Sequence, residues 1–148
     1  MGVTAAKLLP ITIWIARIAA AFILLQTVFF KFTGAPESIA LFETIGMEPW
    51  GRYGSGALEL VAAVLLLLPA ARFAATGSVL ALGLMTGAIF LHLTKLGIEV
   101  QGDGGTLFAM AIVVLVSSGF VLLHNRQGLR AWCKLAGSGR GPASGVEA

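Results

Sequence analysis

The sequence predicts an all-α integral membrane protein, a four-helix bundle with its N and C termini both cytoplasmic. Of its 148 residues, 57% are hydrophobic and only 11% are charged. A soluble domain carries about 25% charged residues, so this deficit is typical of a chain that lies mainly in lipid. Four apolar stretches with short connections occupy most of the length. The basic residues gather at one side of these stretches, and that bias predicts the orientation.

The first two spans are predicted at residues 8–30 and 53–68. The first apolar run is long enough to cross about 30 Å of hydrocarbon. It exceeds the ~7–15 apolar residues of a signal peptide and contains Arg17, so we interpret it as a retained helix. The second span is shorter and ends at Pro69, because proline cannot continue a helix.

The connection between these two spans has a pattern of its own. Pro36 suits the first turn of a short helix and Gly46 suits its end. Ile39, Phe42 and Ile45 recur between them at regular spacing, opposite acidic residues. We therefore expect an amphipathic helix that lies on the outer membrane interface.

The third and fourth spans are predicted at residues 73–93 and 105–123. Together with the first two they form a transmembrane domain over residues 1–136. The remaining residues, 137–148, are rich in glycine and serine and predict a disordered tail.

The orientation follows from the positive-inside rule. The connections near Arg52 and Lys95 carry fewer basic residues than the other side of the four stretches, so we place them outside the cell. The side predicted to be cytoplasmic carries Lys7, Arg72, Arg126, Arg130, Lys134 and Arg140.

Several chemistries are excluded by what the sequence lacks. Cys133 is the only cysteine, so no disulfide forms within one chain. His92 and His124 fall at opposite membrane faces in the predicted topology and do not share a haem. No Cys/His cluster predicts a metal site, and no glycine loop predicts phosphate binding. Nucleic acid is not an expected partner, whereas the lipid bilayer is.

Three polar groups in the apolar stretches are expected at one depth near the outer face, namely Lys31, Glu59 and His92. Each costs roughly 2.5–3.5 kcal/mol or more to bury singly in hydrocarbon. The first and third spans run outward and the second runs inward, so antiparallel packing brings the three to a similar level. They predict either a working proton relay or a structural ion pair without chemistry. In a further alternative, Lys31 and His92 extend to the outer headgroups.

Two other features are candidates for structural roles. Arg17 and Lys31 stand about four helical turns apart and share roughly one helix face, so Arg17 either faces the bundle or reaches cytoplasmic headgroups. Gly83 and Gly87 form a Gly-xxx-Gly pair, which permits close helix contact in lipid. That contact is expected within the bundle or between protomers.

Taken together, these residues resemble the DoxX family. The resemblance covers roughly residues 14–124 and includes an Arg in the first helix, a Lys at its end and a His that ends the third helix. It also includes the stretch Ile45-Gly46-Met47-Glu48-Pro49 and the pattern Gly56-x-x-Glu59-Leu60.

The resemblance implies a four-helix protein of the bacterial cytoplasmic (inner) membrane with a link to quinone-coupled redox systems. The positions that it carries over are Arg17, Lys31, Glu59 and His92. Since no second cysteine is present, any thiol chemistry would come from a partner.

The leading hypothesis is an accessory or quinone-interacting subunit of a membrane redox system. In it, Glu59 relays a proton, Lys31 keeps Glu59 charged, and His92 is the titrating partner. A quinone is the candidate ligand, with its tail against the third helix. The alternative is a non-catalytic scaffold or assembly subunit, bound to a membrane protein partner or to a second copy through the glycine pair. A transporter is disfavoured because no repeat or broken helix is visible.

Overall fold

The computed structural model describes residues 2–129, and within that range all regular structure is helical. The all-α prediction is therefore confirmed for the described part of the chain. The predicted tail and the basic residues from Arg130 onward lie outside it. The helices are α1 (Gly2–Thr33), α2 (Pro36–Thr44), α3 (Trp50–Leu67), α4 (Ala71–Leu91), the π-helical turn η1 (His92–Leu96) and α5 (Thr106–Asn125).

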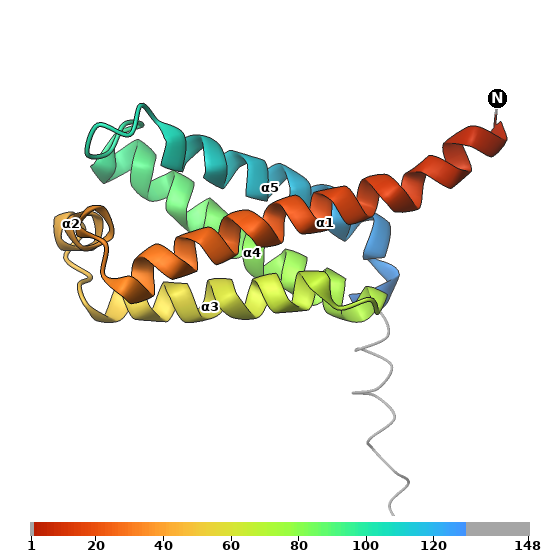
Figure 1. Cartoon of the computed structure of the whole chain (residues 1–148), viewed down its shortest axis with the longest axis horizontal. Helices are drawn as coiled ribbons and strands as arrows, with labels where there is room; N and C mark the ends of the chain where they lie inside the picture. Colours follow the sequence, from red (N-terminus) through yellow and green to blue (C-terminus); the bar gives the residue numbers. More distant parts are fainter. Residues whose placement is uncertain (1, 130–148) are drawn as a thin grey trace, which may run out of the picture.

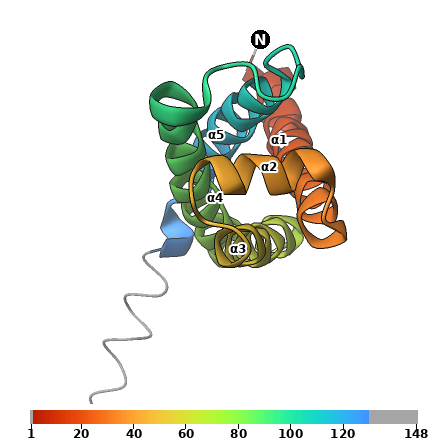
Figure 2. The same ribbon diagram turned by 90° about the vertical axis from the view of Figure 1, so that its left-hand side faces the viewer.

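Four long helices form a closed ring in which each packs against two others. α1 packs against α3 and α5, and α4 packs against the same two helices. α1 and α3 run antiparallel, and α2 lies across one end of the bundle (Figures 1 and 2). We call this the outer end, following the predicted orientation, and we call the opposite end, near Pro69, the inner end.

Within residues 2–129, three segments are long and apolar enough to cross a membrane: Leu8–Thr33, Ala71–Leu96 and Thr106–Asn125. They coincide with the predicted first, third and fourth spans. The predicted second span coincides with α3, which is not among the three. Because α3 packs along α1 and α4, we keep a fourth crossing, and both cytoplasmic termini, as predictions.

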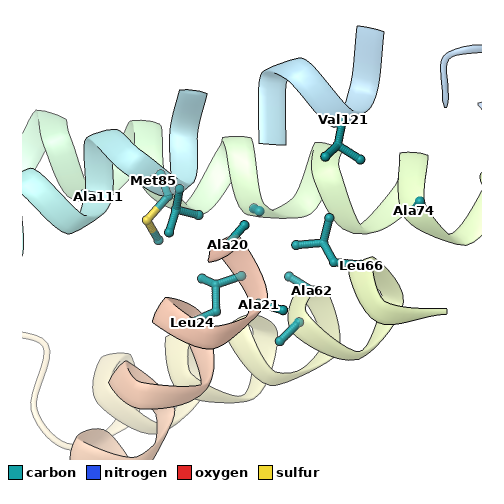
Figure 3. Packing of buried hydrophobic residues seen from close by; sticks show 12 residues of the cluster. Ala20, Ala21, Leu24, Ala62, Leu66, Ala74, Met85, Ala111 and Val121 are labelled. Atoms are coloured by element: carbon teal, nitrogen blue, oxygen red, sulfur yellow. The ribbon is translucent and has the colours of Figure 1, made fainter. Parts of the chain in front are cut away.

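The buried core of the bundle consists largely of small side chains, seen in Figure 3. Alanines from α1, α3, α4 and α5 are packed there with a few larger residues. A Cβ added at Gly77 would lie 2.8 Å from the Leu65 Cβ and 2.9 Å from the Leu66 backbone nitrogen. Such close approach is how helices associate in lipid, where hydrophobic burial contributes little. The core comprises Ala20, Ala21, Leu24, Ala62, Ala63, Leu66, Ala74, Ala81, Met85, Ala111, Val114 and Val121.

The predicted short helix is present as α2, but its apolar side faces the bundle. Pro36 stands in its first turn, and Gly46 follows it with a left-handed φ of 73°. Phe42 and Ile45 are 7% and 9% exposed, so they are covered by protein and not by lipid. The helix therefore closes the outer end of the bundle, and its position at the outer membrane interface stays a prediction.

Candidate functional site

Lys31 and Glu59 form a buried ion pair near the outer end. Lys31 lies in the last turn of α1 and Glu59 in the middle of α3, and antiparallel packing brings them to one level. The Lys31 Nζ lies 2.5 Å from the Glu59 Oε1, and the two side chains are 15% and 5% exposed. The structure thus places these two sequence-predicted residues in direct contact.

Thr27 is a third member of this group that the sequence analysis missed. Its hydroxyl lies 3.0 Å from the Glu59 Oε2 and 2.8 Å from the Leu24 carbonyl oxygen. A hydroxyl has one hydrogen, so it donates to one of these acceptors at a time. Thr27 precedes Lys31 by one helical turn, and this shared face was the available signal.

His92 lies at the start of the π-helical turn η1, where α4 ends. Its Nδ1 is 2.8 Å from the Gly97 carbonyl oxygen, and the centre of its ring lies 5.6 Å from the centre of the Phe108 ring in an edge-to-face arrangement. A carbonyl oxygen only accepts, so Nδ1 carries a hydrogen and the neutral ring keeps Nε2 as an acceptor. In the described part of the chain no hydrogen bond joins His92 to Lys31 or Glu59. The predicted three-residue network is therefore an ion pair and a separate imidazole.

A cavity of about 540 Å³ joins the two parts of this site. Lys31, Glu59 and His92 all line it, and most of its remaining lining is apolar. Side chains of α2, including Phe42, line it as well, and the Lys31 Nζ lies 5.6 Å from the centre of the Phe42 ring. Pockets of this size and lining are typical of small-molecule sites in proteins.

Gly83 and Gly87 lie on the wall of this cavity, and they do not make a close contact within the chain. A Cβ added at either position would meet no heavy atom within 4 Å. Both are exposed, so the cavity is open beside α4. Within the bundle, a close helix contact of the kind predicted for this pair is found instead at Gly77, earlier in α4. A contact between protomers at Gly83 and Gly87 stays a prediction.

Arg17 does not line the cavity and lies at the inner end of the bundle. It is 3% exposed, and its guanidinium lies 4.1 Å from the centre of the Trp14 ring. Its Nε donates to the Leu66 carbonyl oxygen at 2.5 Å, and its Nη2 donates to that of Leu68. These carbonyls lie at the end of α3, where they have no partner within the helix. Of the two sequence alternatives, the structure shows the one that faces the bundle.

Arg52 is a buried residue that sequence reasoning treated only as a charge on the outer side. It is 4% exposed, its Nε lies 2.9 Å from both carboxylate oxygens of Glu48, and its Nη1 donates to the Lys31 carbonyl oxygen. Arg52 thus holds the end of α1 in place beside the Lys31 side chain. The four-residue spacing of Glu48 and Arg52 was the available signal.

Asp103 organises the connection between η1 and α5. Its Oδ1 accepts hydrogen bonds from the amides of Val100 and Gly105, both at 2.9 Å, and its Oδ2 accepts one from Leu107 at 2.8 Å. Burial alone would raise the pKa of this carboxyl, but the three amides lower the pKa below its ordinary value. Asp103 is therefore a fixed negative charge at the outer end.

The model of the DoxX-like family matches residues 15–121 of this chain. The match includes all of the residues that line the cavity. No curated protein and no solved structure shows a significant match to the chain.

Proposed function

The chain belongs to the DoxX-like family, and we propose that its outer cavity binds the ring of a lipid-soluble quinone. The protein would act as an accessory or quinone-interacting subunit of a redox system in the bacterial cytoplasmic membrane. The observation that carries this proposal is one largely apolar cavity with an ammonium, a carboxylate and an imidazole on its wall. Family membership supports the membrane location and not the ligand.

The residues present fit such a ligand. A quinone ring is apolar on its faces and has oxygen atoms at two opposite edges. Lys31 has three N–H donors and Glu59 uses one, so the ammonium retains donors for one oxygen. The Nε2 of His92, on another wall of the cavity, would accept a hydrogen bond from the hydroxyl at the second edge once the ring is reduced to the quinol. The space beside Gly83 and Gly87 would admit the tail from the lipid.

Two groups of the site are able to hold protons. A bound quinone would supply two-electron, two-proton chemistry. The carboxylate of Glu59 accepts one proton, and the neutral His92 ring accepts another at Nε2. The ammonium of Lys31 balances the charge of the Glu59 carboxylate.

The test is ligand retention. The protein would be purified in a mild detergent. Bound molecules would then be extracted into organic solvent, and identified and quantified by mass spectrometry. We expect a stoichiometric quinone in the wild type and its loss in Glu59→Gln. Glu43→Gln, which changes an exposed carboxylate of α2, is the matched control and retains the quinone.

A protein that carries no quinone, or that retains the same amount in Glu59→Gln, contradicts the proposal. If a stable protein partner copurifies without a small ligand, the scaffold function predicted as the alternative takes its place. In that case, replacing Lys31 and Glu59 together by apolar residues leaves partner binding intact, because the pair then serves only to hold the helices in register.

A further inference from the structure

A second cavity, of about 360 Å³, lies at the outer end beside the first. It is bounded by α1, α2, the connection before α5 and the first turns of α5. None of the three predicted site residues lines it, and apolar atoms form most of its surface, but seven of its thirteen lining residues have polar side chains. The polar ones are Gln26, Thr27, Glu37, Ser38, Gln101, Asp103 and Thr106.

Only a thin wall separates the two cavities. Thr27, Leu41, Leu107 and Met110 line both of them. Of these four, Thr27 alone has a polar side chain, and its hydroxyl lies 3.0 Å from the Glu59 Oε2. The hydroxyl therefore stands between the second cavity and the buried carboxylate.

The Thr27 hydroxyl suits both protonation states of Glu59. When Glu59 is ionised, the hydroxyl donates to its Oε2. When Oε2 carries a proton, that proton is donated to the Thr27 oxygen, and the Thr27 hydrogen turns to the Leu24 carbonyl oxygen at 2.8 Å. Neither state leaves a buried hydrogen without an acceptor, so protonation costs little local rearrangement.

We propose that the second cavity is an aqueous inlet through which Glu59 exchanges protons with the water at the outer face, past the Thr27 hydroxyl. In the inward step a hydronium ion gives its proton to the Glu59 carboxylate and leaves as water, and the outward step is the reverse. This inference rests on the proposed function, because it supplies the proton route of the same carboxylate.

The charges around the route favour cations at its mouth. Glu37 of α2 and Asp103 of the connection before α5 line the second cavity, and both are acidic. Lys31 faces Glu59 from α1, and His92 faces the first cavity from η1. Hydronium ions are thus attracted to the mouth of the inlet.

Water access is tested by thiol labelling in the full chain with Cys133→Ser. Thr27→Cys reports on the inlet, and Met110→Cys on the same wall is the second reporter. Thr86→Cys is the matched control, because Thr86 is exposed on α4, lines neither cavity and lies at a similar distance from the outer helix end. The probe is a membrane-impermeant cationic methanethiosulfonate added at the outer face of intact membranes.

We expect Thr27→Cys and Met110→Cys to react about tenfold or more faster than Thr86→Cys, since only a hydrated thiol ionises readily. Ser38→Trp, which fills the second cavity, should slow the Thr27→Cys reaction, whereas Gly87→Trp, which fills the first, should not. Reaction rates at the two reporters that equal the rate at the Thr86→Cys control overturn the inlet. So does a Thr27→Cys reaction rate that Ser38→Trp leaves unchanged.

The two proposals fail separately. If the wild type retains quinone but neither Thr27→Cys nor Met110→Cys reacts faster than the control, the inlet is wrong and quinone binding stands. If both reporters react quickly but no quinone is retained, the quinone function is wrong and the inlet alone is supported.

Discussion

The two ends of the α1–α3 pair are each held by an arginine that donates to backbone carbonyls, yet both cavities described above lie at the outer end. At the inner end Arg17 of α1 donates to the last carbonyls of α3, and at the outer end Arg52 of α3 donates to a carbonyl of α1. The difference lies along α4. At Gly77 its backbone touches α3, whereas at Gly83 and Gly87 the space beside it is empty.

The comparison indicates that the inner and outer halves of the bundle have different roles. In the inner half, alanines such as Ala62, Ala63 and Ala74 and the Gly77 contact close the bundle. In the outer half, Lys31, Glu59 and His92 line an open cavity. Substitutions at the inner end should therefore affect stability first, and those at the outer end ligand binding.

The largest effect is expected at the inner end, from Arg17→Met. The change removes two charge-assisted hydrogen bonds and leaves the carbonyls of Leu66 and Leu68 without these donors, at a cost of about 4 kcal/mol. The loss of unfolding free energy is measured by unfolding with sodium dodecyl sulfate in mixed micelles. Arg72→Met, at an exposed arginine of α4, is the control and should change little.

At the outer end, Lys31→Met should cost about 3 kcal/mol because it leaves Glu59 buried without its ion-pair partner. Lys31→Met combined with Glu59→Leu should recover most of that stability while quinone retention stays lost. The same unfolding assay measures both, with Lys95→Met as the exposed control. A double variant as unstable as the single one would mean that the ion pair is needed for the fold itself.

The glycines of α4 test the comparison directly. Gly77→Ala should destabilise the protein by about 2 kcal/mol, because the added Cβ meets the α3 backbone. Gly87→Ala should leave stability unchanged or raise it by up to about 1 kcal/mol, since alanine favours the helix and the space is free. Unfolding curves of the two variants in one detergent decide this; similar destabilisation by both would refute the division between the halves.

The smallest effect is expected at Asp103. Asp103→Asn should cost about 1 kcal/mol at neutral pH, because an NH2 group replaces Oδ2 and cannot accept the hydrogen bond from the Leu107 amide. Since the folded pKa lies below the ordinary value of about 3.9, the stabilisation is complete above that pH and is lost as pH falls through the folded pKa. Thermal unfolding between neutral and strongly acidic pH should show this loss in the wild type and a smaller one in the variant.

Much of the fold, and the ion pair, could be predicted from the sequence. The four apolar stretches coincide with four long helices, and the antiparallel order of the first two correctly placed Lys31 beside Glu59. The direction of individual side chains could not be predicted. His92 bonds the Gly97 carbonyl and not the ion pair, because α4 continues into a π-helical turn that no spacing in the sequence indicates.

The roles of Thr27, Arg52 and the glycines also depended on their neighbours. In the sequence Thr27 has no distinguishing feature, and its role depends on the Glu59 carboxylate that α3 places beside it. The role of Arg52 likewise depends on the end of α1, whose Lys31 carbonyl accepts its hydrogen bond. Gly77 and Gly87 are alike in sequence, yet one touches backbone and the other borders a cavity.

The sequence by itself determined the helices and the level of each polar group along them, because position along a helix axis advances by about 1.5 Å per residue and is counted directly. Only the tertiary structure decided which groups touch, where the bundle is closed and where it is open. Separation and rotation between helices depend on the packing of all neighbouring side chains at once. For this reason the ion pair was predictable, and the two cavities beside it were not.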